Sequence, residues 1–448
     1  MLGALAQKAA PARPRPNILF LMADDLASWM LGCYGNKEIK TPNIDRLAQS
    51  GMRFINHAVC TPICSASRAT FFTGRTPMQH GIQDFLTDSP IATPPQGQKE
   101  IPASFASEVH ISDVLAKSGY QCGYIGKWHM GGEAQPDHSY QHWCTTRGGS
   151  GPYQDPTLYL NGKPVEEKGY LAEILTRRAI EFLDQRDKSK PYFLTVSYTN
   201  PHTPYDGHPQ KYYDLYAKTN FDTIGWEPAA ANALREKEYL KDMVPNLRKC
   251  AASVTALDDQ VGLLFDRVLK AWQTENTLVV FTGDNGFLLG RHGLWSKGLA
   301  SDPINMFEEV MQVPMIWSWA GQIPIQSQRP ELISAYDLVP SLCDAAGTDV
   351  PARNLCGTSY LSLAQGKIRG RKEKPWRSTI FGHFRNTQMA RNRRFKLIVR
   401  DSGEGPGELY DLSKDTRERA NLYDNPQYVS VQKELGQQLK TWSEKYSS

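Results

Sequence analysis

The sequence predicts an α/β fold, with a large, mostly parallel central sheet flanked by helices and a smaller C-terminal subdomain that holds a short antiparallel sheet and a helix. Three observations support this prediction. Near-continuous apolar runs alternate with helical patterns, polar side chains follow directly after several of these runs, and short alternating strands begin beyond a basic segment near residue 370. The expected boundaries are residues 1–370 for the large domain and 371–448 for the subdomain.

The apolar runs are interpreted as buried strands, because a parallel strand covered by helices on both faces is apolar along its whole length. They span residues 17–22, 120–126, 192–198 and 277–283, and a fifth core strand is predicted at residues 313–319. Apolar residues at three- and four-residue spacing predict helices over residues 171–185 and 247–272. A shorter helix near residues 111–119 has Ser112 as its expected N-cap and Gly119 at its C-terminal end, and another helix is expected over residues 335–346.

The last part of the chain has a different pattern. Short segments at residues 378–384, 387–392, 395–401 and 408–412 predict a small antiparallel sheet, and a final helix over residues 428–446 is expected to pack on it. Two basic runs occur at residues 368–377 and 390–396. They form either a solvated linker and strand edge or a rim that attracts an anionic substrate.

Composition argues against several classes of protein. Hydrophobic residues make up 40% of the 448 residues, which is enough for a large core, and a net charge of +4 is too small to indicate a nucleic-acid-binding protein. The eight cysteines include no C-x-x-C pair, which argues against a zinc ribbon. No apolar run approaches the ~20 residues that span a bilayer. The apolar patch in residues 1–16 is too short for a complete export signal, so this segment is either the remainder of a trimmed signal or a flexible tail.

Polar side chains follow four of the predicted strands. Because the carboxyl ends of parallel strands meet at one edge of a sheet, where ligands bind, these side chains are expected to lie close together. The first strand is followed by Asp24 and Asp25, the second by Lys127 and His129, the third by His202, and the fourth by Asp284 and Asn285.

The acidic members of this set, together with Asn285, offer only oxygen ligands, which suit Ca²⁺ or Mg²⁺ better than zinc. A cation there would also neutralise the repulsion among three carboxylates. Basic side chains beside such a cation favour a tetrahedral oxyanion, from either a sulfate or a phosphate ester. These side chains are Arg68, Lys127, His129, His202 and Lys297.

Two cysteines, Cys60 and Cys64, lie just before a predicted helix over residues 65–75. A nucleophile at the helix N-terminus would face free backbone N–H groups and the positive end of the helix dipole. Arg68 lies one turn after Cys64 on the same face, a relation that Cys60 does not share. A soft-metal site made of Cys60, Cys64 and His57 is a weaker alternative, because the rest of a tetrahedral ligand set is missing.

These motifs resemble those of the type I sulfatases of the alkaline phosphatase superfamily. The signature of that family, C-x-P/A-x-R followed by T-G, is matched by Cys64, Ala66, Arg68, Thr73 and Gly74. Supporting matches are "NILFLMADD", "GKWHMG", "NPHTP", "TGDNG", "HGLWSKG" and "ELYDLSKDTRERANL", in the order of the family and across nearly the whole chain. Two positions depart from the usual pattern: Ala66 stands where proline is common, and Gln312 where arginine is common before V-P.

The resemblance implies that a maturation enzyme oxidises Cys64 to formylglycine, whose hydrate is the nucleophile. One hydroxyl would attack sulfur, and His129 would then take the proton of the other as sulfate leaves. The resemblance assigns one calcium ion, with magnesium as the alternative, to Asp24, Asp25, Asp284 and Asn285 with residue 64. It also assigns Arg68 and Lys127 to the diol and the metal shell, and His202 and Lys297 to the sulfate oxygens and the leaving alcohol.

The expected function is hydrolysis of a sulfate monoester, with a sulfated carbohydrate as the natural substrate and aryl sulfates as surrogates. Two alternatives stay open: a phosphonate or phosphate ester hydrolase on the same scaffold, and a glycan-binding protein with an inactive site. Residues 87–108, 142–165 and 208–228 are expected to form irregular walls around the substrate, and a periplasmic or secreted location is expected. Aromatic side chains in the last two walls serve either for sugar stacking or for ordinary packing: Trp143, Tyr153, Tyr159, Tyr212, Tyr213 and Trp226.

Overall fold

The computed structural model describes residues 15–87, 103–271, 276–367 and 375–447. Its centre is a ten-stranded sheet with the order β11-β2-β10-β9-β1-β8-β4-β5-β6-β7. The five strands β9 (Thr277–Gly283), β1 (Asn17–Ala23), β8 (Tyr192–Ser197), β4 (Gln121–Gly126) and β5 (His142–Thr146) are parallel. The prediction of a large, mostly parallel sheet is therefore confirmed.

At each edge of these five strands the next strand runs antiparallel to them. β10 (Met315–Trp319) pairs with β9 and with β2 (Met52–Phe54), beyond which lies β11 (Ser327–Arg329). At the other edge, β6 (Thr157–Leu160) and β7 (Lys163–Glu166) form a hairpin. Residues 142–165, which the sequence presented as an irregular wall, therefore contain three strands of the sheet. The prediction of an irregular segment was wrong for these strands, which are short and two of which follow turns that contain glycine, but the β5–β6 loop is irregular and its residues Gly148, Gly149 and Ser150 line a cavity.

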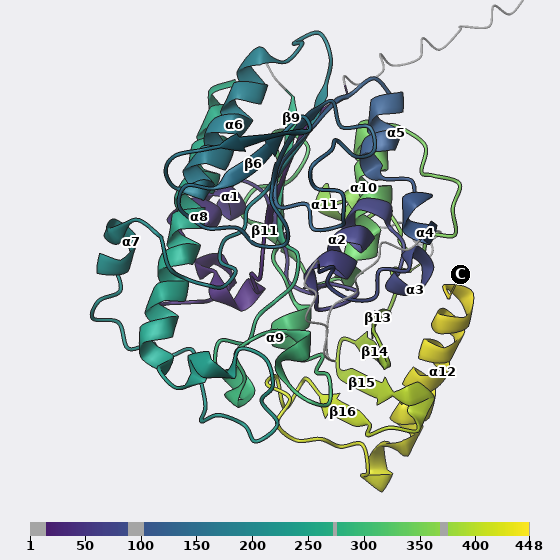
Figure 1. The fold of residues 1–448 in the computed structure, drawn as a ribbon. Helices are drawn as coiled ribbons and strands as arrows, with labels where there is room; N and C mark the ends of the chain where they lie inside the picture. The colour runs from purple at the N-terminus through teal and green to yellow at the C-terminus, as the bar shows by residue number, and fades with distance from the viewer. Residues whose placement is uncertain (1–14, 88–102, 272–275, 368–374, 448) are drawn as a thin grey trace, which may run out of the picture.

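Helices cover both faces of the sheet (Figure 1). One face carries α1 (Pro42–Gln49), α6 (Leu171–Gln185) and α8 (Met243–Ala271), and the other carries α2 (Cys64–Thr73), α5 (Ile111–Lys117), α10 (Leu338–Ala346) and α11 (Leu361–Ala364). The side chains of β1 alternate between two hydrophobic cores, with Phe20 and Met22 in one and Leu19 and Leu21 in the other. Burial on both faces explains why this strand is apolar throughout.

The start of α5 differs from the prediction. His110, not Ser112, is the N-cap, and its backbone N–H donates to Oδ2 of Asp113 at 2.9 Å. Ser112 lies in the first turn, where its side chain is buried. The helix ends at Lys117 with Ser118 as C-cap, and Gly119 follows in a left-handed conformation with φ +91°.

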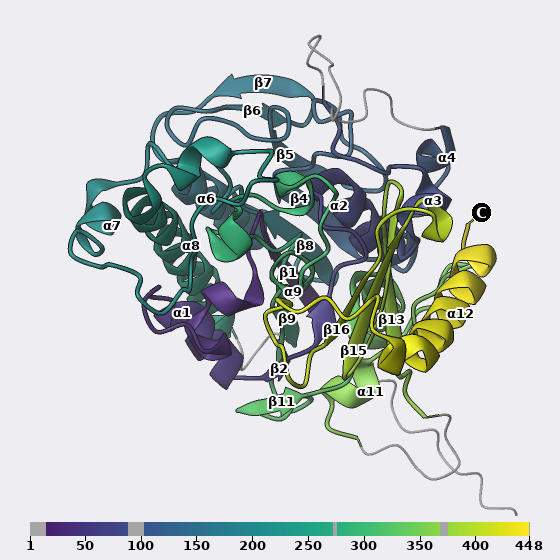
Figure 2. The ribbon, with the colours of Figure 1, turned by 90° about the horizontal axis from the view of Figure 1, so that it is seen from below.

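The C-terminal part forms a separate four-stranded antiparallel sheet, as the sequence predicted (Figure 2). Its strands are β13 (Thr379–Phe384), β14 (Thr387–Asn392), β15 (Phe395–Arg400) and β16 (Glu408–Asp411). Helix α12 (Val429–Lys445) covers one face through Leu435, Leu439 and Trp442, and the ring of Trp442 stacks on Phe381 at 5.2 Å between centroids. The short elements are β3 (His57–Ala58), α3 (Pro77–His80), α4 (Ala103–Ala106), α7 (Gln210–Asp214), α9 (Glu308–Met311) and β12 (Ile333–Ser334).

In the second basic run, residues 390–396, two of the basic side chains are buried in ion pairs. Arg391 and Lys396 therefore belong neither to a solvated strand edge nor to a rim that attracts substrate. Lys396 is fully buried and its Nζ lies 3.1 Å from Oε1 of Glu308 and 2.8 Å from Oε1 of Glu418. Arg391 Nη2 lies 2.9 Å from Oε2 of Glu308. Most of the first run, like residues 1–14 and 88–102, lies outside the described residues. Among the helices that are described, none has the length and apolar character needed to cross a membrane.

Candidate active site

Four neighbouring parallel strands deliver the predicted polar residues to one edge of the sheet. The register places Ala23 beside Gly283 and Met22 beside Ser197, so the residues that follow β1, β9 and β8 come together. Backbone hydrogen bonds continue past the strand ends: the N–H of Asp284 donates to the carbonyl of Ala23 at 2.9 Å, and the N–H of Lys127 donates to that of Ser197 at 2.9 Å. The close approach predicted from the sequence is therefore observed.

Three carboxylates form the floor of the site. One oxygen from each of Asp24, Asp25 and Asp284 lies within 4.8 Å of the others, and all three side chains are buried. Asn285 donates from Nδ2 to Oδ1 of Asp25 at 2.7 Å, while its own Oδ1 is buried without a hydrogen-bond partner among the described residues. Four oxygen-bearing side chains with an unsatisfied amide oxygen fit a hard cation such as calcium or magnesium.

The pKa values of these three carboxyls are set by burial and neighbouring carboxylates, which raise them, and by neighbouring cations, which lower them. Burial and the nearby Asp24 raise the pKa of Asp284 above its ordinary value. Burial also raises the pKa values of Asp24 and Asp25, but their positive neighbours together outweigh it, led by Lys127 for Asp24 and by Lys297 for Asp25, so both pKa values are lowered overall. The site is thus held together by charge compensation, since isolated buried carboxylates would take up protons instead.

Three cations surround the carboxylates. Arg68 donates from Nε to Oδ2 of Asp284 at 2.9 Å, and its Nη1 donates to the carbonyl of Lys127 at 2.8 Å. The ammonium of Lys127 pairs with Asp24, and that of Lys297 pairs with Asp25. We call these six residues the strand-edge cluster: Asp24, Asp25, Asp284, Arg68, Lys127 and Lys297.

Cys64 begins helix α2 and faces this cluster. Its Sγ lies 2.7 Å from Nζ of Lys297 and 3.5 Å from Oδ1 of Asp24. Burial raises the pKa of the thiol to about 12, so an unmodified Cys64 is protonated and a poor nucleophile at neutral pH. Cys60 instead packs in the C-terminal core with Tyr336, and its carbonyl accepts a hydrogen bond from His383. The structure therefore favours Cys64, as the spacing to Arg68 predicted.

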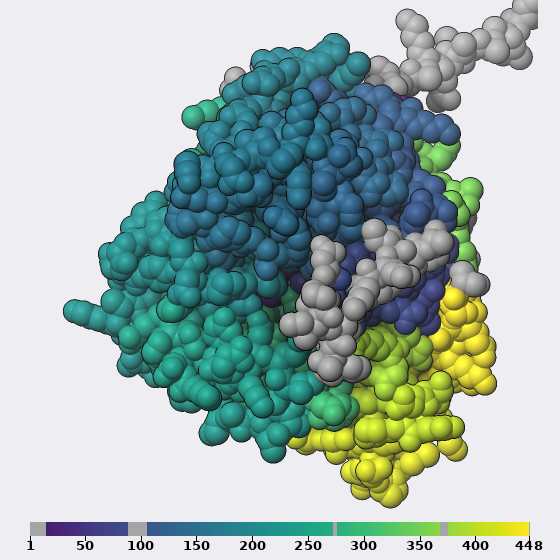
Figure 3. Space-filling view, viewed as in Figure 1, coloured from purple at the N-terminus to yellow at the C-terminus, as the bar shows by residue number. Residues whose placement is uncertain are grey.

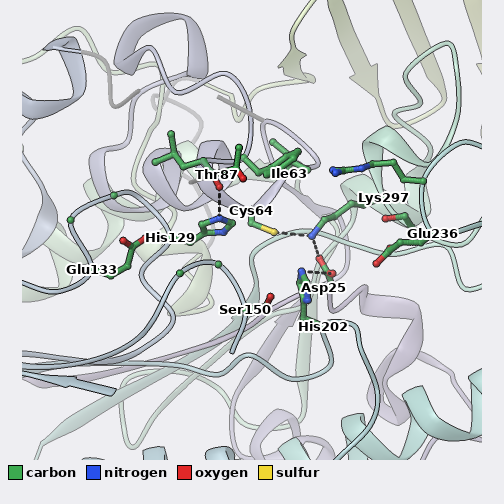
Figure 4. A pocket seen from close by; sticks show the side chains of 18 residues that line it. Asp25, Ile63, Cys64, Thr87, His129, Glu133, Ser150, His202, Glu236 and Lys297 are labelled. Atoms are coloured by element: carbon green, nitrogen blue, oxygen red, sulfur yellow. Dashed lines mark hydrogen bonds and ion pairs between the residues drawn. The ribbon is translucent and has the colours of Figure 1, made fainter. Parts of the chain in front are cut away.

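Two histidines flank the thiol (Figure 4). His129 has a positive φ of 56°, its Nε2 lies 2.9 Å from the carbonyl of Leu86, and its Nδ1 has no partner in the described part of the chain. Burial, and then Lys127, lower its pKa well below the usual value, so the imidazole is neutral at neutral pH. On the other side, Nε2 of His202 lies 3.8 Å from Oδ2 of Asp25. His129 therefore offers a neutral imidazole beside the thiol, and His202 lies next to Asp25.

A glycine makes room for one of these histidines. A Cβ at Gly149 would lie 2.3 Å from Nε2 of His129, which no side chain could tolerate without displacing the ring. Gly149 lies in the loop between β5 and β6, so the edge of the sheet helps to fix the position of His129. The sequence did not single out this residue, because a loop glycine gives no sign of what it approaches.

A cavity of about 520 Å³ opens above the cluster, and Figure 3 shows a hollow near the centre of that face. Among the predicted site residues, Asp25, Cys64, His129, His202 and Lys297 line it, and the others lie beneath. None of the six aromatic candidates lines this cavity: Trp143, for example, is fully buried in the core. Trp143, Tyr153 and Tyr212 are buried and serve ordinary packing, whereas Trp226 is exposed away from the cavity. The wall residues that the sequence did not predict include Phe85, Glu133, Arg235 and Glu236.

Comparison with known proteins agrees with this geometry. A family model described as sulfatase matches residues 16–348, and one described as N-sulphoglucosamine sulphohydrolase, C-terminal, matches residues 290–445. The N-acetylglucosamine-6-O-sulfatase of Bacteroides thetaiotaomicron is 28% identical over 512 residues, covering 96% of this chain and 87% of its own. Human arylsulfatase A is 28% identical, with 94% of this chain and 86% of its own covered.

Solved structures give the same result. A protein in complex with its substrate, D-glucosamine-2-N,6-O-disulfate, has a TM-score of 0.82 and 26% identity, with 97% of this chain and 98% of that chain covered. The phosphonate monoester hydrolase of Agrobacterium radiobacter shares the fold, with a TM-score of 0.73, 20% identity and 96% of each chain covered. The sulfatase model extends from the first strand through helix α10 and includes every residue that faces the strand-edge cavity, so this chain belongs to the sulfatase family and is a sulfuric ester hydrolase.

Proposed function

We propose that this enzyme hydrolyses a sulfate monoester of a sulfated carbohydrate, with aryl sulfates as surrogate substrates. The observation that carries the proposal is the position of Cys64, which is buried between the carboxylates and Lys297 and opens onto the cavity. Relatives named for sugar sulfates, and a structural neighbour bound to a sulfated glucosamine, support a carbohydrate substrate.

The proposed cofactor is a calcium ion, with magnesium as the alternative, held by Asp24, Asp25, Asp284 and Asn285 together with residue 64. The unpartnered Oδ1 of Asn285 and the three converging carboxylates support this ligand set. Such an ion, when bound, supplies positive charge that polarises the sulfate ester. Arg68 and Lys127 carry further positive charge beneath residue 64, and they are proposed to hold it in place.

The nucleophile is proposed to be formylglycine hydrate made from Cys64, for which the thiol stands in here. A geminal diol supplies one hydroxyl to attack sulfur and a second whose deprotonation expels sulfate and restores the aldehyde. His129 is proposed to take that second proton, since its imidazole is held neutral beside Cys64. Lys297 and His202, on the opposite side of the thiol, are proposed to bind the sulfate oxygens and to assist the leaving alcohol.

Three further expectations belong to the same proposal. A maturation enzyme that accepts alanine at position 66 oxidises Cys64, and the enzyme works in the periplasm or outside the cell, where sulfated glycans are found. The division into a catalytic domain (residues 1–370) and a C-terminal subdomain (371–448) is supported by the separate four-stranded sheet. These three expectations rest on the family and the fold. Enzyme purified from its native source would show whether Cys64 has been oxidised and in which cell fraction the enzyme is found.

Tandem mass spectrometry of the tryptic peptide 54–68 from native enzyme tests the nucleophile, because this peptide contains both cysteines. We expect an aldehyde at position 64 and an intact thiol at position 60. An aldehyde at Cys60 would overturn the assignment. Two thiols together with aryl sulfate turnover by the same sample would show that formylglycine is not required.

The phosphonate or phosphate ester hydrolase remains the second candidate, because the phosphonate monoester hydrolase shares the fold. Converted enzyme should hydrolyse 4-nitrophenyl sulfate with a higher kcat/KM than the phosphate diester that has the same leaving group. A preference for the phosphorus ester would reverse the order of the two candidates. A converted enzyme that binds sulfated sugars but hydrolyses neither ester would instead be a glycan-binding protein.

Replacing Lys127 or His129 with alanine should reduce aryl sulfate turnover by roughly a hundredfold or more, the range found for general acid–base and charge-stabilising groups. Circular dichroism and thermal melting of each variant provide the control for folding. Near-normal turnover by either variant would remove that residue from the proposed mechanism.

A further inference from the structure

One wall of the cavity carries a guanidinium that the proposed chemistry of sulfate transfer does not use. Arg235 lines the cavity together with Lys297 and Cys64, but it lies outside the strand-edge cluster. We propose that Arg235 binds a second oxyanion of the substrate, either a sulfate on the sugar that carries the scissile sulfate or a carboxylate on the sugar next to it. This inference rests on the proposed function, and it narrows the substrate class to sugars with at least two anionic groups.

The backbone around Arg235 is attached to the loop that carries Lys297. Leu234 donates from its N–H to the carbonyl of Ala300 at 2.8 Å, and the N–H of Asp302 donates to the carbonyl of Asn232 at 3.2 Å. Between these bonds, Ala233 and Ser301 form an antiparallel bridge. These two hydrogen bonds join the segment that carries Arg235 to the loop that carries Lys297. The distance between Arg235 and the proposed sulfate-binding residue Lys297 is therefore fixed by the backbone.

An aromatic ring supports the guanidinium. The Cζ of Arg235 lies 4.6 Å from the centroid of Phe85, and Phe85 also lines the cavity. The neighbouring residue, Asp84, accepts a hydrogen bond from Nε of Arg385 at 2.7 Å. Arg385 lies in the turn between β13 and β14, so the C-terminal sheet anchors the segment that carries Phe85. Stacking on the ring restricts the guanidinium and leaves its edge N–H groups free to bind a planar pair of oxygens.

Arg235 has no ion pair with any carboxylate in the part of the chain that the structure describes, and its side chain is partly buried. The adjacent Glu236 accepts a hydrogen bond from the hydroxyl of Thr203, which holds its carboxylate in a separate interaction. A half-buried, aromatic-supported arginine on a cavity wall is well suited to bind a sulfate or carboxylate through two hydrogen bonds. The charge of Arg235 lowers the pKa of nearby Asp84 and so offsets part of the rise that burial causes, but the carboxylate of Asp84 pairs with Arg385, which leaves the guanidinium edge of Arg235 available to an anion.

The test measures binding, so that it does not depend on turnover. Full-length protein that retains the Cys64 thiol, in the presence of calcium, is titrated by calorimetry with three ligands. These are N-acetylglucosamine 6-sulfate, glucosamine-2-N,6-O-disulfate, and a 6-sulfated disaccharide that bears a uronic acid. We expect at least one dianionic ligand to bind roughly tenfold or more tightly than the monosulfated sugar, as a charge-assisted hydrogen bond would provide. The ligand that is preferred identifies the second group as sulfate or carboxylate.

Three variants test whether Arg235 is the source of the preference for dianionic ligands. Arg235→Ala and Arg235→Gln should bring the ratio of dissociation constants close to one, and Arg235→Lys should retain part of it, because a lysine keeps the charge but not the planar fork. The matched control is Arg393→Ala, which removes the same charge from an exposed position in the β14–β15 turn, where the ratio should not change. Equal binding of the three ligands, no binding of any, or a preference that survives Arg235→Ala would overturn the proposal. Sulfate release from 4-nitrophenyl sulfate by converted enzyme tests the proposed function separately.

Discussion

Two clusters of buried charge in the described part of the chain differ in what surrounds them. The strand-edge cluster lies at the carboxyl ends of the parallel strands. The second, which we call the junction cluster, consists of Glu308, Glu418, Arg391 and Lys396 and joins α9 to the C-terminal sheet. Both have strongly perturbed carboxyls: positive neighbours outweigh burial and lower the pKa of Glu308 to about 2, while burial raises that of Glu418 to about 8.

Only one of these clusters lines the cavity of about 520 Å³ described above. Asp25 and Lys297 line the cavity, and no member of the junction cluster does. In the junction cluster, Arg391 and Lys396 of the C-terminal sheet both pair with Glu308 of α9. Gln312, one turn after Glu308, also donates a hydrogen bond to it. Gln312, at the position where sulfatases often have arginine, is uncharged. It therefore adds only a hydrogen bond to Glu308, which Arg391 and Lys396 already hold. The comparison teaches that buried charge and shifted pKa values indicate a reactive site only where they meet a cavity.

The largest expected difference between the clusters is in activity. Removing divalent cations with a chelator, or replacing Asp25 with asparagine, should lower kcat/KM for an aryl sulfate by roughly a hundredfold or more, because the charge that polarises the ester is lost. Initial rates with and without added calcium measure this effect. Glu418→Gln is the matched control in the junction cluster, and its kcat/KM should not change. Full activity of metal-free protein would contradict the proposed cation site.

The next effect is on stability. Lys396→Met should lower the free energy of unfolding by about 3–5 kcal/mol, because it removes the cation that Glu418 pairs with and leaves Glu308 with Arg391 alone. Urea unfolding measures the change, and Lys396→Arg is the conservative control. The kcat/KM of the folded variant should stay close to that of the wild type. A loss of activity in properly folded Lys396→Met would mean that the junction cluster also supports the site.

A smaller effect should appear in the pH dependence of stability. The ordinary pKa of glutamate is 4.5 and that of Glu418 is raised to about 8, so between these values the folded chain binds a proton that the unfolded chain has released. This group therefore makes stability fall as the pH rises from about 4.5 to about 8. Urea midpoints of the wild type and Glu418→Gln at several pH values isolate the contribution. We expect the variant to lose less stability over that interval, and parallel curves would contradict the raised pKa.

The smallest effect is expected at an exposed pair. Nζ of Lys168 lies 3.2 Å from Oδ2 of Asp155 on the surface, where solvent screens the interaction. Lys168→Ala should leave both the urea midpoint and kcat/KM unchanged within error. A clear decrease in either would show that burial is not what separates the two clusters from ordinary ion pairs.

The sequence predicted those parts of the fold whose pattern is local. The helix at residues 171–185 was predicted with its observed bounds, and the four C-terminal strands within a residue of theirs, because periodicity alone defines them. Strands β6 and β7 were missed because they are only four residues long, lie at the sheet edge and are partly exposed. Their place depends on pairing with β5, which no local pattern records.

The same contrast applies to the site. Cys64 and Arg68 could be placed together from their spacing on one helix, and the acidic residues from their position after strands. Arg235 and Phe85 could not, because their loops have no periodicity and are positioned by ties to the Lys297 loop and to Arg385. The residues proposed to bind the sulfate are thus encoded locally, whereas the proposed subsite for the rest of the substrate depends on tertiary contacts.

The burial of helix α2 has a consequence for the timing of synthesis. All ten of its side chains are buried, and Cys64 is 2% exposed. Part of this cover comes from α10, which contacts α2 but follows Cys64 by roughly 270 residues, so at ~5–20 residues per second a ribosome makes it roughly 15–50 s later. The enzyme proposed to oxidise Cys64 therefore meets α2 without its α10 cover during that interval.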